Sequence, residues 1–164
     1  MDLLQYSRRY DAFSINDAVM GGLSSSLWHD DTLPASFSGR VSLANHGGFA
    51  SIRTLFADLD ISDYCGLQLL VKGDNKQYKL NLIAHPGDRG VVFQQVFFAS
   101  SQWRSLYLPL DKFVARRRGQ PVDDVMDPKR LGGFGLVIAG RQPEFEAGEF
   151  QLLIQALELV STPS

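Results

Sequence analysis

The sequence predicts an all-β protein that folds as an antiparallel β-sandwich. Apolar and polar residues alternate with a period of two along most of the chain, which is the pattern of half-buried strands. Short clusters of Gly, Pro, Asn and Asp separate the alternating runs. Many short strands with such turns are typical of sandwiches, so we expect one sandwich domain over residues 1–164.

The expected strands follow one another in chain order. Each has apolar side chains on one face, which enters the core, and other side chains on the face that meets solvent or a ligand. The alternating runs lie at residues 37–43, 67–71, 78–82, 91–97 and 134–138, and turns are expected at 73–75, 86–88 and 119–121.

Helix signals are few. Asp127 is placed to cap one helical turn, with Pro128 at its first position. The last run, residues 149–160, fits one face of a helix as well as a strand. We expect a closing strand there, because a sandwich needs its last edge paired.

Composition limits the class of protein. The chain has 45% hydrophobic and 21% charged residues and a net charge of −2, as a globular domain does, and this charge favours neither nucleic acid nor an anionic membrane. Its apolar runs are far shorter than the roughly 20 residues of a membrane span. A lone Cys65 excludes an internal disulfide, and the start lacks a signal-peptide pattern. We therefore expect a cytoplasmic protein without a membrane span that binds no nucleic acid.

Two segments share one pattern: an amide or carboxylate, a Gly-Gly pair, a large apolar residue and small polar residues. They are NDAVMGGLSSS at residues 16–26 and NHGGFASIR at 45–53, and KGD at 72–74 is similar. Glycine permits positive φ and a close approach of another chain or a ligand. The segments are therefore either structural turns or loops around a ligand. Neither Gly pair has the spacing of a phosphate-binding loop.

The candidate site consists of polar side chains from these segments. We expect Asp17, Asn45, Arg53 and Asp74 to meet at one place on the sandwich. An arginine between carboxylates is charge-balanced, so the group either locks the loops together or binds a ligand. Trp28 joins the candidates as a ring exposed in a polar loop, suited to stacking on a sugar.

No pattern of catalytic or metal-binding residues is present in the sequence. His29, His46 and His85 lack metal-ligand spacing, and there is neither a G-x-S-x-G segment nor a calcium loop. We therefore predict that the protein is not an enzyme and has no catalytic residues, no cofactor and no metal. Cys65 and Trp103 are expected to be core residues.

The order and spacing of five motifs resemble the complex I intermediate-associated protein family, the thirty-kilodalton assembly factor. The motifs are NDAVMGGLS, FSGRVSLANHGGFASIR, VKGDNKQYK, a Trp before LPLDKF, and LGGFGLVIAG, and the match runs from about residue 13 to 159. The resemblance implies an antiparallel jelly-roll β-sandwich of the galactose-binding-like kind. It implies no catalytic reaction.

The resemblance also implies a function. It indicates a binding domain that holds a protein partner, such as a subunit of a respiratory or membrane complex, as an assembly factor or chaperone does. The alternative is a carbohydrate-binding module of jelly-roll type. Ala18 stands where the family commonly has glycine and Ala44 where it commonly has an acidic residue, which favours a compact bacterial relative over a mitochondrial protein. An exposed apolar patch would favour the protein partner, and a concave groove with an exposed ring would favour the sugar.

Overall fold

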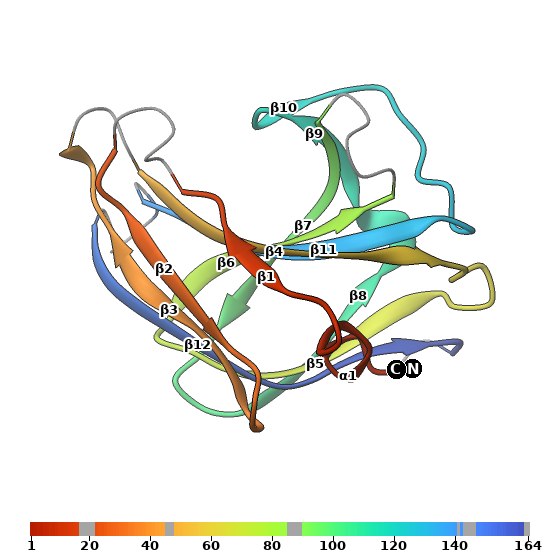
Figure 1. Ribbon diagram of the computed structural model, residues 1–164, viewed down its shortest axis with the longest axis horizontal. Helices are drawn as coiled ribbons and strands as arrows, with labels where there is room; N and C mark the ends of the chain where they lie inside the picture. The colour runs from red at the N-terminus through yellow and green to blue at the C-terminus, as the bar shows by residue number, and fades with distance from the viewer. Residues whose placement is uncertain (17–21, 45–47, 85–89, 141, 143–146, 163–164) are drawn as a thin grey trace.

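The computed structural model describes residues 1–16, 22–44, 48–84, 90–140, 142 and 147–162. In this part of the chain, two antiparallel sheets pack face to face (Figure 1). The seven-stranded sheet has the order β1 (Ala12–Ser14), β4 (Phe49–Leu59), β11 (Leu131–Ala139), β6 (Lys76–Ile83), β7 (Val91–Ala99), β9 (Val114–Arg117), β10 (Gln120–Pro121). The five-stranded sheet has the order β2 (Ser25–His29), β3 (Ala35–Val41), β12 (Gly148–Val160), β5 (Gly66–Lys72), β8 (Arg104–Pro109).

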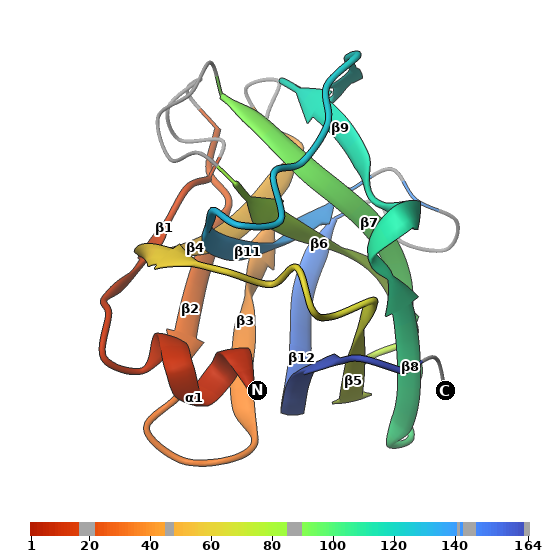
Figure 2. The same cartoon turned by 90° about the vertical axis from the view of Figure 1, so that its right-hand side faces the viewer.

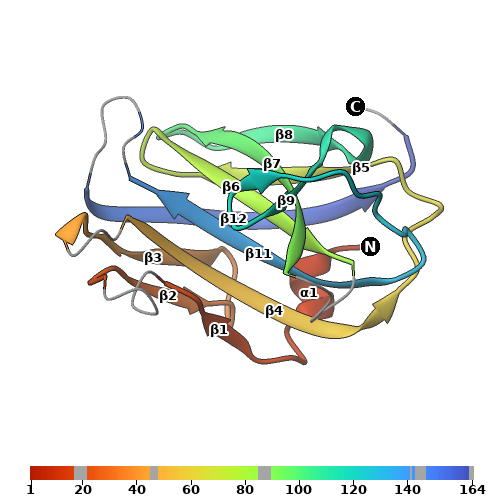
Figure 3. The same cartoon turned by 90° about the horizontal axis from the view of Figure 1, so that it is seen from above.

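The expected antiparallel sandwich is confirmed. The five alternating runs fall on β3, β5, β6, β7 and β11, and their apolar positions face the space between the sheets. The closing strand is confirmed as well, because β12 pairs with β3 on one side and with β5 on the other. Seen from above, strands of the seven-stranded sheet cross over those of the five-stranded sheet (Figure 3).

Large rings fill the centre of the core. Tyr78 and Phe37 are fully buried, and Phe150 lies with its ring centroid 4.9 Å from that of Phe37. Tyr78 comes from the seven-stranded sheet, whereas Phe37 and Phe150 come from the five-stranded sheet. The aromatic contacts therefore join the two layers.

One end of the core is covered by a short helix that the sequence did not reveal. Helix α1 (Leu3–Ser7) begins after Asp2, whose carboxylate accepts a hydrogen bond of 2.8 Å from the Leu4 amide. The helix lies beside β12, away from β9 (Figure 2). Five residues are too few to show a helical period. A 3-10 turn, η3 (Leu110–Lys112), follows β8 and was also not predicted.

Three local expectations have different outcomes. The Asp127 carboxylate accepts from the Lys129 amide at 3.0 Å, but the segment is a hydrogen-bonded turn and not a helix. Trp103 precedes β8 and is exposed, so its assignment to the core was wrong. Cys65 is half-buried, with its sulfur 3.3 Å from the hydroxyl of Tyr107.

In the described chain, no helix is long and apolar enough to cross a bilayer.

Gly48 occupies a backbone conformation that side chains rarely adopt. It has φ of 150° just before β4, and its carbonyl accepts a hydrogen bond of 2.8 Å from the Gly140 amide. We expect Gly48→Val to lower the free energy of unfolding by about 1–3 kcal/mol, because a β-branched residue is strained at this φ. Denaturant titration measures this loss. The matched control is Ala44→Val, an exposed position of the same connection. Equal midpoints for the two variants would contradict the prediction.

Candidate functional site

The structure places the sequence-predicted site residues in several parts of the fold. Asp17 and Asn45 lie outside the described residues, and their role stays a prediction. Arg53 lies in the middle of β4, whereas Asp74 lies in the turn between β5 and β6. Trp28 lies on β2, so its assignment to a polar loop was wrong.

Asp74 is held by a network that joins the two sheets. The hydroxyl of Tyr78 donates to one of its carboxylate oxygens at 2.9 Å. The backbone amide of Gln151 donates to the other at 2.8 Å, and the Lys76 ammonium lies 3.0 Å from that same oxygen. Tyr78 belongs to the seven-stranded sheet and Gln151 to the five-stranded sheet, so the carboxylate ties one layer to the other.

The network shows that Asp74 has a structural role. Burial raises the pKa of Tyr78, and the adjacent Asp74 charge raises it further, so the hydroxyl stays protonated and donates. A buried hydroxyl without an acceptor would destabilise the core. The Asp74 carboxylate supplies that acceptor.

Arg53 and Asp74 do not lie together. No ion pair joins them among the described residues. Gly135 of β11 is paired with Arg53 of β4 on one side and with Asn81 of β6 on the other, so Arg53 lies level with Asn81 in the sheet. Along β6, Asn81 lies about 16 Å from Lys76 at the rise of a strand. Arg53 is therefore far from the turn that contains Asp74.

Asn16, which directly precedes Asp17, has a defined structural role. Its side-chain oxygen accepts from the Ser26 hydroxyl at 3.0 Å and from the Ser51 amide at 2.9 Å. Ser26 is on β2 and Ser51 on β4, so this amide clamps the two sheets at one edge. The NDAVMGG motif thus begins with a structural contact.

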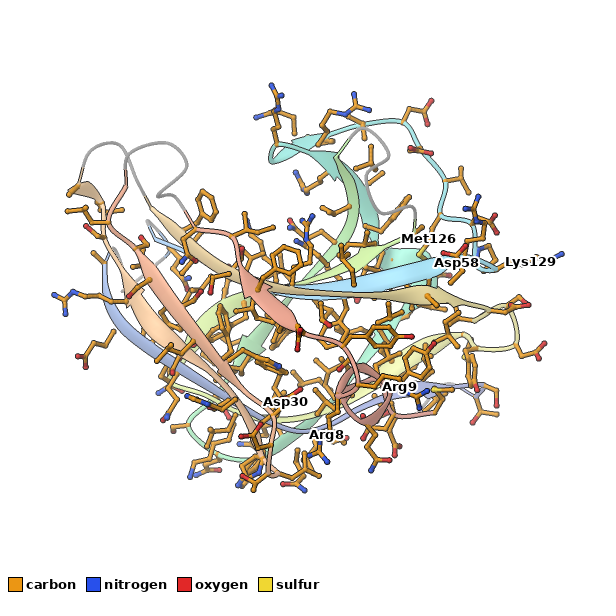
Figure 4. All side chains as sticks on the ribbon, in the orientation of Figure 1. Arg8, Arg9, Asp30, Asp58, Met126 and Lys129 are labelled. Carbon is orange, nitrogen blue, oxygen red and sulfur yellow. The ribbon has the colours of Figure 1, made fainter. Side chains whose placement is uncertain are left out.

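Trp28 packs partly against the core and lines a surface pocket of about 320 Å³. Arg8 and Asp30, both labelled in Figure 4, line the same pocket. Its walls carry charges of both signs. The backbone of Trp28 pairs in register with Phe37 of β3, which anchors the residue in the sheet.

A larger surface is formed by the outer face of the seven-stranded sheet. Core positions alternate with outward positions on each strand, and the register aligns the outward residues in a row across six strands. This row consists of Phe13, Arg53, Gly135, Asn81, Gln94 and Val114. A parallel row carries Ser51, Val137, Lys79 and Val96.

The sheet curves so that β9 and β10 rise over the outer side of β4 and β11 (Figure 1). We call the outward side chains of this curved surface the concave face. It comprises Phe13, Arg53, Lys79, Asn81, Gln94, Val96, Phe98, Val114 and Arg116. Its four large apolar members, Phe13, Val96, Phe98 and Val114, are 43% to 52% exposed.

The polar members of the concave face are more buried. Asn81 is only 6% exposed, and its side-chain oxygen accepts a hydrogen bond of 2.8 Å from the Gln94 amide. Arg53 and Lys79 are half-buried. Burial lowers the pKa of the Arg53 guanidinium. Burial, and then the charge of Arg116, lower the pKa of Lys79.

These residues have a signal in the sequence. Strand β6 reads KQYKLNLI, where Lys79 and Asn81 occupy the positions between buried Tyr78, Leu80 and Leu82. The alternation shows which face is outward. It does not show which outward faces come together, because that depends on strand order, and β4, β11 and β6 are far apart in sequence.

Among the described residues, no group of three His, Cys, Asp or Glu side chains is placed to hold a metal ion. The concave face combines cations, amides and apolar groups. It is suited to holding a ligand by hydrogen bonds, charge and apolar contact.

Comparison with solved structures shows the class of fold. The family 11 carbohydrate-binding module from Clostridium thermocellum, in complex with a β-1,3-1,4-mixed-linked tetrasaccharide, has a TM-score of 0.63 and 13% identity over 96% of this chain and 91% of that chain. The family 11 module of the cellulosomal cellulase Lic26A-Cel5E of the same organism has a TM-score of 0.61 and 13% identity over 93% of this chain and 88% of that chain.

A larger protein contains the same fold. The glycoside hydrolase domain structure of Endo-D from Streptococcus pneumoniae R6 has a TM-score of 0.54 and 13% identity, and the match covers 94% of this chain and 22% of that chain. A comparison with curated protein sequences finds no match. At such low identity the structural likeness shows the fold alone.

The protein is thus a jelly-roll β-sandwich of the galactose-binding-like class. The family model described as complex I intermediate-associated protein 30 matches residues 4–154, which is nearly the whole chain. The chain therefore belongs to the complex I intermediate-associated protein 30 family.

The Asp74 network makes a measurable contribution to stability. We expect Asp74→Ala to lower the free energy of unfolding by about 2–3 kcal/mol, because it leaves the buried hydroxyl of Tyr78 without its acceptor. Tyr78→Phe keeps the ring and removes the donor. In the Tyr78→Phe background we therefore expect Asp74→Ala to have a smaller effect, as a double-mutant cycle by denaturant titration measures. Strict additivity of the two changes would contradict the coupling.

Proposed function

We propose that this chain is a non-catalytic binding domain that holds a protein partner on its concave face, as an assembly factor or chaperone does. The observation that carries this proposal is that large apolar side chains are exposed at both edges of that face: Val96, Phe98 and Val114 on the neighbouring strands β7 and β9, and Phe13 on β1. Exposed apolar groups on one face are typical of protein-binding surfaces.

The family supports a particular class of partner. Its description refers to an intermediate of complex I, so we propose a subunit of a respiratory or other membrane complex. The proposed role involves no catalytic step, because holding a subunit during assembly needs only reversible contacts. A cytoplasmic location stays a prediction from composition.

A carbohydrate is the second candidate ligand. It is favoured by the curvature of the face and by two exposed rings, Phe13 and Phe98. Sugar-binding faces commonly stack Trp or Tyr on apolar sugar faces, and the exposed rings of this face are phenylalanines. The half-buried Arg53 and Lys79 also give the face a positive charge that binding a neutral sugar does not require. The protein partner is therefore the stronger proposal.

Site-specific photocrosslinking tests the proposal. A benzophenone amino acid is placed at Val96 on the concave face and, as the matched control, at exposed Leu27 on β2 of the other sheet. We expect the Val96 variant to crosslink one protein or a small set in cells, because the side chain lies on the binding surface. The Leu27 variant is expected to crosslink none of them. Mass spectrometry identifies the products, and titration with each purified protein confirms binding.

Two results would contradict this function. One is equal crosslinking from Val96 and Leu27, which would mean that the concave face has no special role. The other is binding to neutral glycans on a glycan array, lost on Phe13→Ala, with no protein crosslinked at Val96. That second result would replace the protein partner by a carbohydrate.

A further inference from the structure

We infer that the partner segment held by the concave face is an acidic, extended peptide whose carboxylates pair with Arg53 and Lys79. This inference rests on the proposed function, and it names the chemistry of the partner. It is carried by three observations: two cations with no carboxylate partner among the residues that the structure describes, their spacing across the sheet, and the length of the face.

The first observation is a charge imbalance. The ion pairs of the described chain are Lys76 with Asp74 at 3.0 Å and Arg130 with Asp58 at 3.0 Å. Figure 4 shows Asp58 at the end of the molecule beside Lys129. Neither pair includes a cation of the concave face. Arg53 and Lys79 are both half-buried, no described carboxylate forms an ion pair with either, and the like charge of Arg116 acts on Lys79.

Such an arrangement favours an anionic ligand. Taking a cation partly out of water is unfavourable unless an opposite charge or hydrogen-bond acceptors replace the water. Burial lowers the pKa of both Arg53 and Lys79, which reflects this unfavourable transfer. A bound carboxylate opposes the effect at each residue and forms charge-assisted hydrogen bonds, which are stronger than neutral ones. An arginine can bind it with two parallel bonds.

The second observation is the placement of the cations. Arg53 on β4 and Asn81 on β6 flank Gly135 of β11 in one row, so they are about 10 Å apart at the usual strand spacing. Lys79 is the next outward residue of β6, about 7 Å along that strand. The Cα atoms of the two cations are therefore roughly 12 Å apart across the centre of the face. Carboxylates four residues apart on one extended segment, at about 3.3 Å per residue, match this separation.

The third observation is the length of the face. The row from Phe13 to Val114 crosses six strands, a width of about 24 Å. An extended peptide of about seven residues has this length. Its ends would reach the exposed side chains of Phe13 and Val114. The side-chain amide of Gln94, which donates to the Asn81 oxygen at 2.8 Å, lies in the centre and is half-buried, so it can bond the peptide backbone.

A rival surface lies on the five-stranded sheet. A pocket of about 580 Å³ is lined by Arg40 and Lys76, but also by Asp74 and Glu149. Its positive charges are thus matched by nearby carboxylates. An acidic peptide therefore has a stronger electrostatic preference for the concave face, and Arg40 supplies a control cation for the test.

Peptide selection tests this inference. A library of random twelve-residue peptides is selected on the wild-type chain, on the Arg53→Gln/Lys79→Gln double variant and on Arg40→Gln. We expect Asp and Glu to be enriched on the wild type and on Arg40→Gln, and not on the double variant. A synthetic peptide chosen from the wild-type pool is expected to bind the double variant at least tenfold more weakly. Its analogue with Asn and Gln in place of Asp and Glu is expected to lose binding similarly.

A measurement on the unmodified chain complements the variants. Titration of the wild type with the chosen peptide between low and high salt is expected to show affinity falling several-fold, because salt screens partly exposed charge pairs. This readout remains informative even if the double variant melts early. Thermal melts of all variants are compared first, and single variants Arg53→Gln and Lys79→Gln replace the double variant if it is unfolded.

The outcomes separate this inference from the proposed function. Peptides without acidic enrichment, or acidic peptides that bind the double variant as well as the wild type, would overturn the inference. If crosslinking at Val96 still captured a protein, the proposed function would stand. The chain could instead bind polygalacturonate and no peptides, and the double variant could lose that binding. This result would overturn the inference of a peptide ligand, although Arg53 and Lys79 would still form an anion-binding site. Loss of acidic binding in Arg40→Gln alone would move the site to the other sheet.

Discussion

The structure depends on one constraint: a tyrosine hydroxyl lies in the middle of an apolar core and must have an acceptor. Tyr78 is fully buried, and the carboxylate of Asp74 accepts a hydrogen bond of 2.9 Å from its hydroxyl and another of 2.8 Å from the Gln151 amide of the opposite sheet. One turn residue therefore satisfies the core and fixes the two layers relative to each other.

The alternation of inner and outer positions separates stability from function along single strands. In β6, Tyr78, Leu80 and Leu82 enter the core, whereas Lys79 and Asn81 face outward. A change on the inner face alters packing, which a dense core tolerates poorly. A change on the outer face alters the surface that meets a ligand. The period of two thus lets the outward side chains vary while the sandwich stays the same. This agrees with the family 11 module, which has a similar fold although its sequence is only 13% identical to this chain.

Much of the fold is readable from the sequence, because alternation is a local property. The closing strand β12 follows from alternation together with the need to pair an edge. Helix α1 has no such signal, since its stability comes from packing Leu3 and Leu4 into the core. The candidate site is less readable. Arg53 was singled out from a glycine loop, yet its described neighbours, Gly135 and Phe13, depend on strand order, which no local pattern contains.

The glycines of LGGFGLVIAG illustrate how a motif can build a site without contacting a ligand through a side chain. Gly133 and Gly135 are the outward positions of β11, and Cβ atoms there would lie 2.5 Å from the Thr54 oxygen and 2.8 Å from the Ile52 oxygen. These positions therefore require glycine for the close approach of β11 to β4. Gly135 lies between Arg53 and Asn81 in the register and contributes no side chain to the face. The side chains that meet a ligand then come from the strands on either side, and the glycine motif sets the spacing between them.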